Sequence, residues 1–181
     1  DGRQMGSWKA AEKFDFKSHG EVKVQEGVIS LGQGSPATGI HFNGELPRTD
    51  YEISLDARRT DGSDFFCGLT FPIGTTYCSF IVGGWGGGVV GMSNINNMSA
   101  VENETTGYLE VKQNQWYHIR VRVTGSRLQA WVDGERMVDM KTADNKFSIW
   151  WEQEPMRPLG IASWNTSAEL RNIRITYAFD K

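Results

Sequence analysis

The residues from 51 to 88 read YEISLDARRTDGSDFFCGLTFPIGTTYCSFIVGGWGGG, and this stretch decides the fold. Over Tyr51–Arg58 apolar and polar residues alternate one for one, which is the period of a half-buried β-strand. A second apolar row begins at Phe65, after the turn-forming residues Thr-Asp-Gly-Ser-Asp. A third run, Tyr77–Val82, returns after Pro-Ile-Gly-Thr-Thr. The stretch therefore predicts three consecutive strands joined by tight turns.

The alternation also predicts which side chains share a face. If the three strands are neighbours, one face is the core and contains Phe65, Cys67, Leu69 and Phe71, with Phe66 on the opposite side. The other face is polar and available for binding or chemistry. Its expected members are Glu52, Ser54, Asp56, Arg58, Asp64 and Thr70.

The remainder of the chain predicts further short strands and no convincing helix. Hairpins are expected around Gln25-Glu26-Gly27 and around Asp133-Gly134-Glu135. Another strand is expected over Lys146–Trp151. About a dozen short strands separated by turns are typical of a β-sandwich or jelly roll. We therefore expect one all-β domain over residues 1–181, with the segment 1–19 packed on it.

Composition excludes several classes of partner. The 19 basic and 22 acidic residues are interspersed and give a net charge of −3, which offers no long-range attraction for nucleic acid or an anionic membrane. No apolar run approaches the roughly 20 residues of a membrane-spanning helix. We therefore expect neither a nucleic-acid partner nor membrane insertion.

Two cysteines, Cys67 and Cys78, fall in consecutive predicted strands. They are either buried free thiols or a cross-strand disulfide, and a disulfide would indicate an oxidising compartment. A turn centred on Gly74 places them slightly out of register, which favours free thiols.

Four motifs resemble the concanavalin A-like, or laminin G-like, jelly roll: WYHIRVRV (116–123), LQAWVDGE (128–135), LGIA (159–162) and LRNIRI (170–175). More narrowly, the chain is similar to the 3-keto-disaccharide hydrolase family, which is abundant in secreted bacterial proteins. The sequences DFFCGLTFP (64–72) and GGWGG (83–87) look like a planctomycete-type branch. The resemblance implies two curved antiparallel sheets with a sugar on the concave face, in a secreted, periplasmic or cell-surface protein.

The chain also departs from the family pattern. Family members carry an Asn-Ser-Gly-apolar-apolar-Arg strand where this chain has DFFCGLTF (64–71), without the arginine. The family's Gly-Tyr-Glu strand is replaced by YCSFIV (77–82). The resemblance therefore implies the fold more firmly than a hydrolytic activity.

The polar face supplies the candidate catalytic residues. Crowded carboxylates raise one another's pKa, so Asp64, Glu52 and Asp56 together can provide an acid and a base, as glycoside hydrolysis requires. Arg58 is a candidate for bonding sugar hydroxyls. The plainer interpretation is a solvated strand face on which arginines neutralise the acids.

Tryptophans supply the candidate stacking platforms. Trp85 is surrounded by glycines, which leave room for a sugar ring over the indole. Trp151 and Trp164 are further ligand-binding candidates, and one of Trp150 and Trp151 is expected in the core because adjacent strand residues face opposite sides. Trp116 and Trp131 are expected in the core.

No cofactor or metal motif is present. The histidines lie apart, no Walker loop or zinc spacing occurs, and the run at Gly83 lacks a following Lys-Ser/Thr. The amide-rich loop Asn94–Glu104 offers oxygen ligands suited to Ca²⁺, but it does not match an EF-hand. A plain polar loop is the simpler interpretation.

Three functions are compatible with these observations. The first hypothesis is a carbohydrate-binding domain, and the second is a 3-keto-disaccharide type hydrolase that uses a carboxylate on the concave face. The third is a structural module of an extracellular or envelope assembly, which uses exposed strands or loops to pair with other copies.

Overall fold

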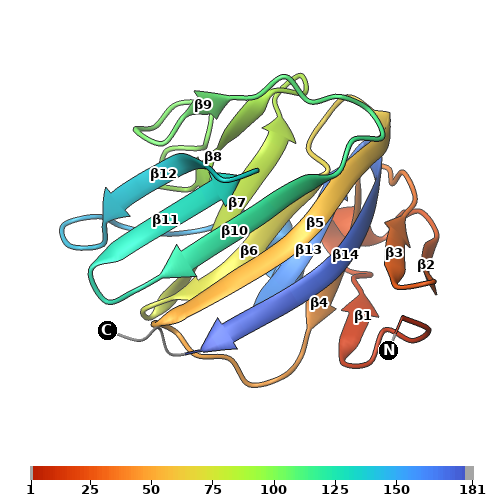
Figure 1. Ribbon diagram of the computed structural model, residues 1–181, viewed down its shortest axis with the longest axis horizontal. Coiled ribbons are helices and arrows are strands. Elements are labelled where there is room, and N and C mark those ends of the chain that lie inside the picture. Colours follow the sequence, from red (N-terminus) through yellow and green to blue (C-terminus); the bar gives the residue numbers. More distant parts are fainter. Residues whose placement is uncertain (1, 178–181) are drawn as a thin grey trace.

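The computed structural model describes residues 2–177 and consists of two antiparallel β-sheets packed face to face (Figure 1). Sheet A contains, in spatial order, β1 (Trp8–Ala10), β4 (Ala37–Phe42), β13 (Leu159–Trp164), β6 (Cys67–Ile73), β7 (Thr76–Gly84), β8 (Val89–Ser93) and β9 (Gly107–Tyr108). Sheet B contains, in spatial order, β12 (Glu135–Lys141), β11 (Arg127–Val132), β10 (Tyr117–Val123), β5 (Tyr51–Gly62), β14 (Thr166–Tyr177), β3 (Val28–Leu31) and β2 (Val22–Gln25). Two short 3₁₀ helices are η1 (Phe14–Phe16) and η2 (Trp151–Met156).

Strand β5 is the centre of sheet B and pairs with β10 on one side and β14 on the other. Tyr51, Ile53, Leu55 and Ala57 are buried, while the residues between them are partly exposed. The alternation predicted over Tyr51–Arg58 is confirmed. The strand continues four residues further than the clear alternation, to Gly62.

Sheet A is organised around the strands β6, β7 and β8. The β6–β7 hairpin turns at Gly74, so that Cys67 lies opposite Val82 and Cys78 lies opposite Phe71. Both cysteines are free and buried, and burial raises the pKa of each thiol to about 12. The register argument for free thiols is therefore confirmed.

Both predicted hairpins are also present. The β2–β3 turn has positive φ at Glu26 and Gly27, and the β11–β12 turn has positive φ at Asp133 and Gly134. Two consecutive positive-φ residues match the right-handed twist of the flanking strands, which explains why the Asp-Gly sequence predicts its turn correctly.

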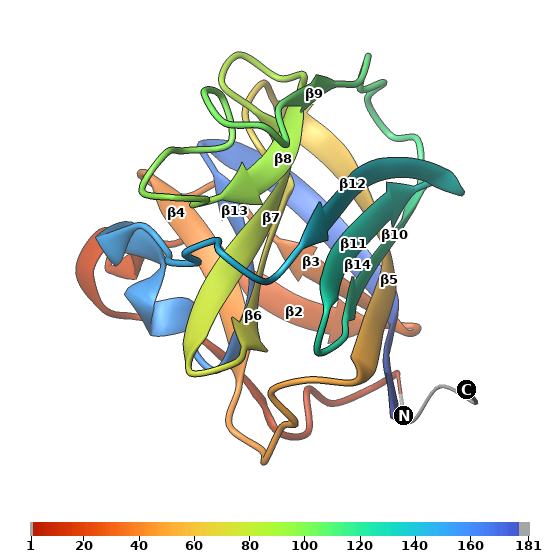
Figure 2. The same ribbon diagram turned by 90° about the vertical axis from the view of Figure 1, so that its left-hand side faces the viewer.

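The hydrophobic core lies between the two sheets, which are seen edge-on in Figure 2. Each sheet turns one face inward and leaves the other as an outer face. The Tyr51 hydroxyl crosses the layer and donates a hydrogen bond to the Pro72 carbonyl, which joins β5 to β6. Buried side chains that fill this layer include Ile53, Leu55, Leu69, Phe71, Phe80, Met92, Ile119 and Val121. The prediction of an all-β jelly-roll sandwich is confirmed.

The prediction that one polar face unites the residues of the first three central strands is wrong. Glu52, Asp56 and Arg58 lie on the outer face of sheet B, whereas Asp64 lies at the outer face of sheet A. The reason is that β5 and β6 are consecutive in sequence but do not pair with each other.

The expected positions of two neighbouring phenylalanines are exchanged. Strand β6 begins only at Cys67, so the alternation does not extend back through Phe65 and Phe66. Phe66 is fully buried in the core between the sheets, and Phe65 packs with Trp164 on the outer side of sheet A.

Trp116, Trp131 and one of the pair Trp150 and Trp151 were expected in the core, and none of these tryptophans lies there. Lys146–Trp151 forms no strand, and both Trp150 and Trp151 are exposed, because Trp151 begins the helix η2. Trp116 and Trp131 are half-buried beneath arginine side chains and do not lie in the core.

Candidate functional site

The outer face of sheet A is hollowed into a pocket of about 290 Å³, at the lower end of the range of about 300–1,000 Å³ typical of small-molecule sites. Ser79 and Ile81 on β7 and Ser93 on β8 contribute the part of the lining that belongs to sheet A, and the Ser79 hydroxyl lies 2.7 Å from that of Thr70 on β6. The residues lining the pocket are Asp64, Phe65, Ser79, Ile81, Trp85, Ser93, Trp150, Glu152, Gln153 and Trp164.

Trp85 stands in the glycine-rich turn between β7 and β8. Its φ is 46°, a left-handed conformation that is unfavourable for a bulky residue, and its neighbour Gly86 has a φ of 91°. The indole is 43% exposed although it borders the pocket. A strained backbone that leaves a large aromatic ring in solvent points to a binding role for that ring.

Asp64 supplies a carboxylate at the same end of the pocket. Its Oδ1 accepts a hydrogen bond from the Phe65 N–H at 2.7 Å. Burial raises the pKa of the Asp64 carboxyl, and this effect outweighs the opposing influence of the Phe65 and Trp85 N–H groups and of Arg59. The Asp64 carboxyl therefore keeps its proton to a higher pH than an ordinary aspartate does.

Arg59 connects the loops that carry these two residues. Its guanidinium is almost completely buried and donates to the carbonyls of Asp64, Gly87 and Val111 at 3.2–3.3 Å, and to Gln113 Oε1 at 2.5 Å. Burial lowers the pKa of this arginine. A single cation thus fixes the Asp64 turn against the glycine-rich turn.

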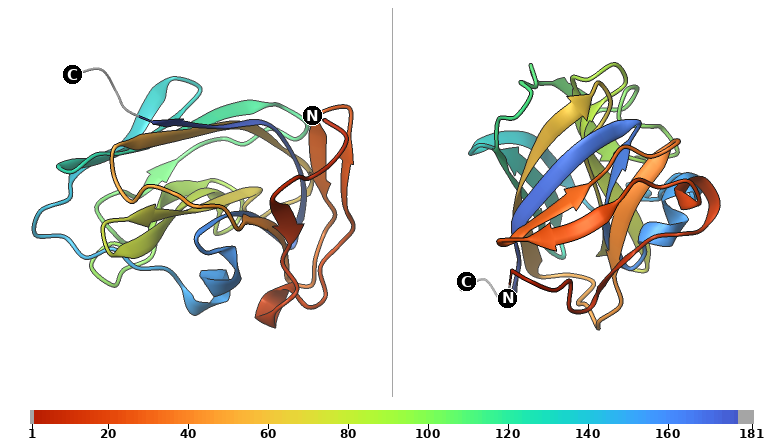
Figure 3. Two further views of the ribbon diagram at one scale, coloured as in Figure 1. Left: turned by 90° about the horizontal axis from the view of Figure 1, so that it is seen from below. Right: turned by 90° about the vertical axis from the view of Figure 1, so that its right-hand side faces the viewer.

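The helix η2 forms the opposite wall and lies on the outer side of sheet A (Figure 3). Met156 packs directly on the sheet, because a Cβ added at Gly160 would lie 2.7 Å from its side chain and one added at Gly39 would lie 2.9 Å from its Sδ. Only glycine permits so close an approach. This contact brings η2 down onto the sheet and directs its first turn towards the pocket.

Two buried polar atoms on that first turn have no hydrogen-bond partner among residues 2–177. Glu152 Oε2 and Gln153 Oε1 are buried without a hydrogen bond, and the Gln153 residue is only 4% exposed. An unpaired buried oxygen costs about 1–3 kcal/mol, so such atoms are rare unless a ligand or ordered water bonds them. Both residues line the pocket.

The structure therefore brings three of the predicted site residues together and separates the others. Asp64, Trp85 and Trp164 all line the pocket. Trp151 does not line it, and its ring instead makes an edge-on contact with Phe14 at 6.1 Å between centroids.

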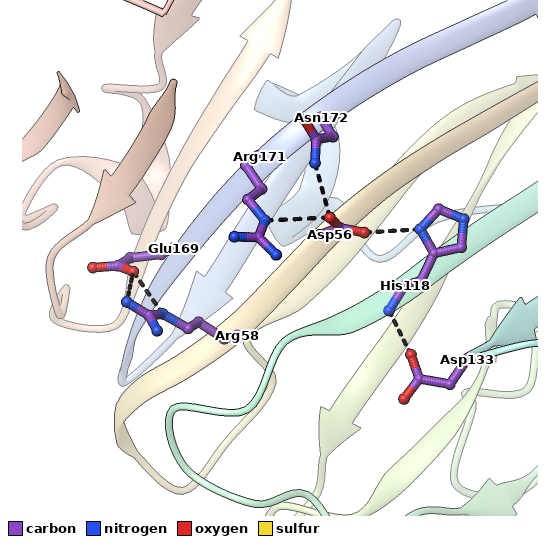
Figure 4. Close-up of polar contacts among 7 residues, drawn as sticks. All are labelled: Asp56, Arg58, His118, Asp133, Glu169, Arg171 and Asn172. Atoms are coloured by element: carbon purple, nitrogen blue, oxygen red, sulfur yellow. Dashed lines mark hydrogen bonds and ion pairs between the residues drawn. The ribbon is translucent and has the colours of Figure 1, made fainter. Parts of the chain in front are cut away.

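Glu52, Asp56 and Arg58 are engaged in ion pairs on the outer face of sheet B. Arg58 pairs with Glu169 at 2.6 Å, and Asp56 bonds His118 at 2.8 Å and Asn172 at 2.9 Å (Figure 4). Burial alone would raise the pKa of Asp56, but hydrogen bonds from His118, Asn172 and Arg171 together lower it. These groups form a charge network, and Glu52, Asp56 and Arg58 do not line the pocket on sheet A.

Sequence reasoning did not propose the other seven lining residues: Phe65, Ser79, Ile81, Ser93, Trp150, Glu152 and Gln153. The sequence WWEQEPM (150–156) does contain a usable signal, since two tryptophans beside two acids and an amide have no strand alternation. Pro155 within this short segment also argues against a strand continuing there.

Within residues 2–177, no three His, Cys, Asp or Glu side chains are grouped so as to hold a metal ion. The amide-rich loop considered for Ca²⁺ uses its best oxygen internally, because Asn103 Oδ1 accepts from the N–H and hydroxyl of Thr105. Among the same residues, no helix has the length and apolarity needed to cross a membrane.

The fold and the pocket define a concanavalin A-like jelly roll with a candidate ligand site on one outer face. The chain belongs to the family of the 3-keto-α-glucoside-1,2-lyase-like domain, whose model matches residues 1–176. The family resemblance expected from the sequence is confirmed. No curated protein sequence matches the chain.

Several solved structures share the fold at low sequence identity. The carbohydrate-binding module CBM66 from Bacillus subtilis has a TM-score of 0.59 at 12% identity, with 93% of this chain and 94% of that chain covered. Domain 4 of AbnA, an extracellular arabinanase from Geobacillus stearothermophilus in complex with arabinotriose, has a TM-score of 0.59 at 12% identity, with 94% and 82% covered. The Ca²⁺- and Man3GlcNAc-bound exoplasmic/lumenal domain of VIP36 has a TM-score of 0.58 at 10% identity, with 98% and 86% covered.

Proposed function

We propose that this chain is a carbohydrate-binding domain and that the pocket on the outer face of sheet A holds the sugar. One observation carries the proposal: the pocket combines exposed tryptophans with buried oxygens that have no hydrogen-bond partner in the described part of the chain. Sugar rings present apolar C–H faces to aromatic rings and hydroxyl donors to oxygen acceptors, so a saccharide satisfies both features.

The polar residues narrow the chemistry of the ligand. Asp64, Glu152 and Gln153 offer oxygens, and the lining contains no lysine or arginine among the described residues. A pocket that offers acceptor oxygens and no cationic side chain favours neutral or amino sugars over uronic acids and sulfated sugars, because an anionic sugar would face two carboxylates.

The family and its structural neighbours support a sugar ligand. The family description names a ketoglucoside, and the AbnA and VIP36 domains are described with bound saccharides. We further propose that the protein works outside the cytoplasm, either secreted, periplasmic or at the cell surface. AbnA is an extracellular arabinanase and the VIP36 domain is exoplasmic/lumenal, and both support this location.

A glycan array followed by titration calorimetry tests the proposal. Trp85→Ala is expected to weaken the tightest glycan by about tenfold or more, because Trp85 is a large aromatic anchor at the pocket edge. Trp151→Ala is the matched control, since this exposed tryptophan lies outside the pocket. Affinity that survives both Trp85→Ala and Asp64→Asn within twofold would disprove this location of the site.

A second candidate function is cleavage of a 3-keto-disaccharide, and it is favoured by the two carboxyls in one pocket. The raised pKa suits Asp64 to act as a general acid, with Glu152 as the second group. Product release measured by chromatography should be abolished in Asp64→Asn and retained in Asp56→Asn, whose carboxylate is on the other sheet. Binding without turnover in the wild-type protein would leave the domain as a binding module.

A further inference from the structure

The outer face of sheet B carries a concentration of cations that the overall charge conceals. Seven of the eleven arginines project from its strands, together with Lys23 and Lys141, as strand register and ion pairs indicate. Five carboxylates share this face in the described strands: Glu52, Asp56, Asp61, Asp139 and Glu169. The face therefore has an excess of four positive charges in a chain whose net charge is −3. The arginines are Arg58, Arg120, Arg122, Arg127, Arg136, Arg171 and Arg174.

Two carboxylates on this face each pair with two arginines and hold those arginines in place. Glu52 pairs with both Arg120 and Arg122, and Asp139 pairs with both Arg127 and Arg136. A guanidinium has five N–H donors, whereas a carboxylate accepts about four hydrogen bonds in all. Arg127 and Arg136, which share Asp139, therefore have more donors than that carboxylate can accept, and their side chains are 39% and 56% exposed.

The pairing register aligns part of this set into one row across the sheet. Arg136 lies opposite Trp131, Trp131 opposite Arg120, Arg120 opposite Ser54, and Ser54 opposite Arg174. Neighbouring strands are about 4.8 Å apart, so this arginine row spans roughly 19 Å. Arg174 is exposed and makes no ion pair with the described residues.

The geometry points to an acidic polysaccharide as the partner of this face, in a binding site separate from the pocket. A flat row of cations is complementary to carboxylate or sulfate groups repeated along an extended chain. The tryptophans of this face are covered, because Arg120 lies 4.4 Å from the Trp131 ring and Arg171 lies 3.9 Å from the Trp116 ring. Neither ring is open for stacking on bases, so the face suits a glycan better than a single-stranded nucleic acid.

Binding to dextran sulfate, with uncharged dextran as the reference polymer, tests this site between 50 and 300 mM salt. The triple variant Arg120→Gln/Arg136→Gln/Arg174→Gln removes the cations of the row and should weaken dextran sulfate binding by about tenfold or more. The salt dependence of its affinity should also become shallower. The corresponding Arg→Lys triple should restore most of the binding, because it keeps the charge.

A matched control separates this surface from general charge effects. Lys9→Gln/Lys13→Gln/Lys17→Gln removes three exposed charges from the segment that carries β1 and η1, on the side of sheet A. This control should change dextran sulfate affinity by less than about twofold. An equal loss in control and row variant, or no binding of dextran sulfate by the wild-type protein at physiological salt, would overturn the proposal.

Two further readouts identify the occupant and keep the two sites distinguishable. An oligothymidylate that binds more tightly than dextran sulfate at equal charge concentration would refute the choice of an acidic polysaccharide. Urea unfolding of each variant excludes misfolding, and the exposed pair Arg136→Gln/Arg174→Gln repeats the test without disturbing the Trp131 contact. Trp85→Ala should leave dextran sulfate binding unchanged, since Trp85 borders the pocket on the other sheet.

Discussion

Replacing Gln153 with methionine should make the unliganded protein more stable while weakening sugar binding. Gln153 is 4% exposed, and its Oε1 is buried without a partner in the protein. Nearly the whole desolvation penalty of that oxygen therefore applies, which is about 1–3 kcal/mol. Methionine has a similar length and no atom that demands a strong hydrogen bond, so Gln153→Met removes the penalty with little change of volume.

The expected gain is about 1–2 kcal/mol in the free energy of unfolding, because part of the penalty is returned as imperfect packing. In a chain of this size, each kcal/mol corresponds to a rise of roughly 2–4 °C in Tm. The same substitution deletes an acceptor for a sugar hydroxyl. A neutral hydrogen bond contributes about 0.5–1.5 kcal/mol, so affinity for the tightest array glycan should fall about two- to tenfold.

Urea denaturation measures the first quantity and titration calorimetry measures the second. Gln129→Met is the control, because Gln129 is partly exposed on β11 and its replacement should change stability by no more than about 0.5 kcal/mol. If Gln153→Met instead lowers the unfolding free energy by more than about 1 kcal/mol, the Gln153 amide is bonded within the protein. The reasoning about an unpaired oxygen directed at a ligand would then be refuted.

Three further outcomes follow from groups described above. Arg59→Met should lower the free energy of unfolding in urea by about 3–5 kcal/mol, because it leaves the carbonyls of Asp64 and Gly87 without their hydrogen bonds from Arg59. Arg59→Lys should lower it less. A stability equal to wild type would contradict the role of Arg59 in joining the two turns. The pKa of Asp56 is lowered in the fold, so the ionised carboxylate stabilises the protein above its unfolded pKa of about 3.9, and this stabilisation is lost as the pH falls through the lowered value. Asp56→Asn should therefore lower the free energy of unfolding at neutral pH but match wild type in strong acid. A difference in unfolding free energy that is constant with pH would contradict the lowered pKa of Asp56. Burial raises the pKa of Cys67 and of Cys78 to about 12, so a thiol reagent at pH 8 should modify neither cysteine in the native protein. Both cysteines should be modified in urea. Rapid labelling of the native protein would show that the core opens.

The sequence predicted local structure well where a local rule determines it. Alternation in β5 identified its buried face, and the Asp133-Gly134 turn defined the β11–β12 hairpin. The pairing of strands was not predictable in the same way, because the neighbours of β5 are β10 and β14, far along the chain. That single long-range choice separates Glu52 and Asp56 from Asp64.

The candidate site was partly predictable for a related reason. Trp85 was proposed because its flanking glycines leave room for a sugar ring over the indole, and its positive φ is a feature that the sequence did not reveal. Gln153 and Glu152 were not identified, because η2 is a short irregular helix whose residues have no strand or helix periodicity. Its position depends on Met156 packing against Gly39 and Gly160, a contact that joins three distant parts of the sequence.

The contact of Met156 with Gly39 and Gly160 determines how closely η2, one wall of the pocket, lies against sheet A. An alanine at either Gly39 or Gly160 would add one methyl group against Met156 and push η2 away from the sheet. The turn that bears Glu152 Oε2 and Gln153 Oε1 would move with η2, while both side chains stay chemically unchanged. A substitution at Gly39 or Gly160 is therefore expected to change the width of the pocket without changing the residues that line it.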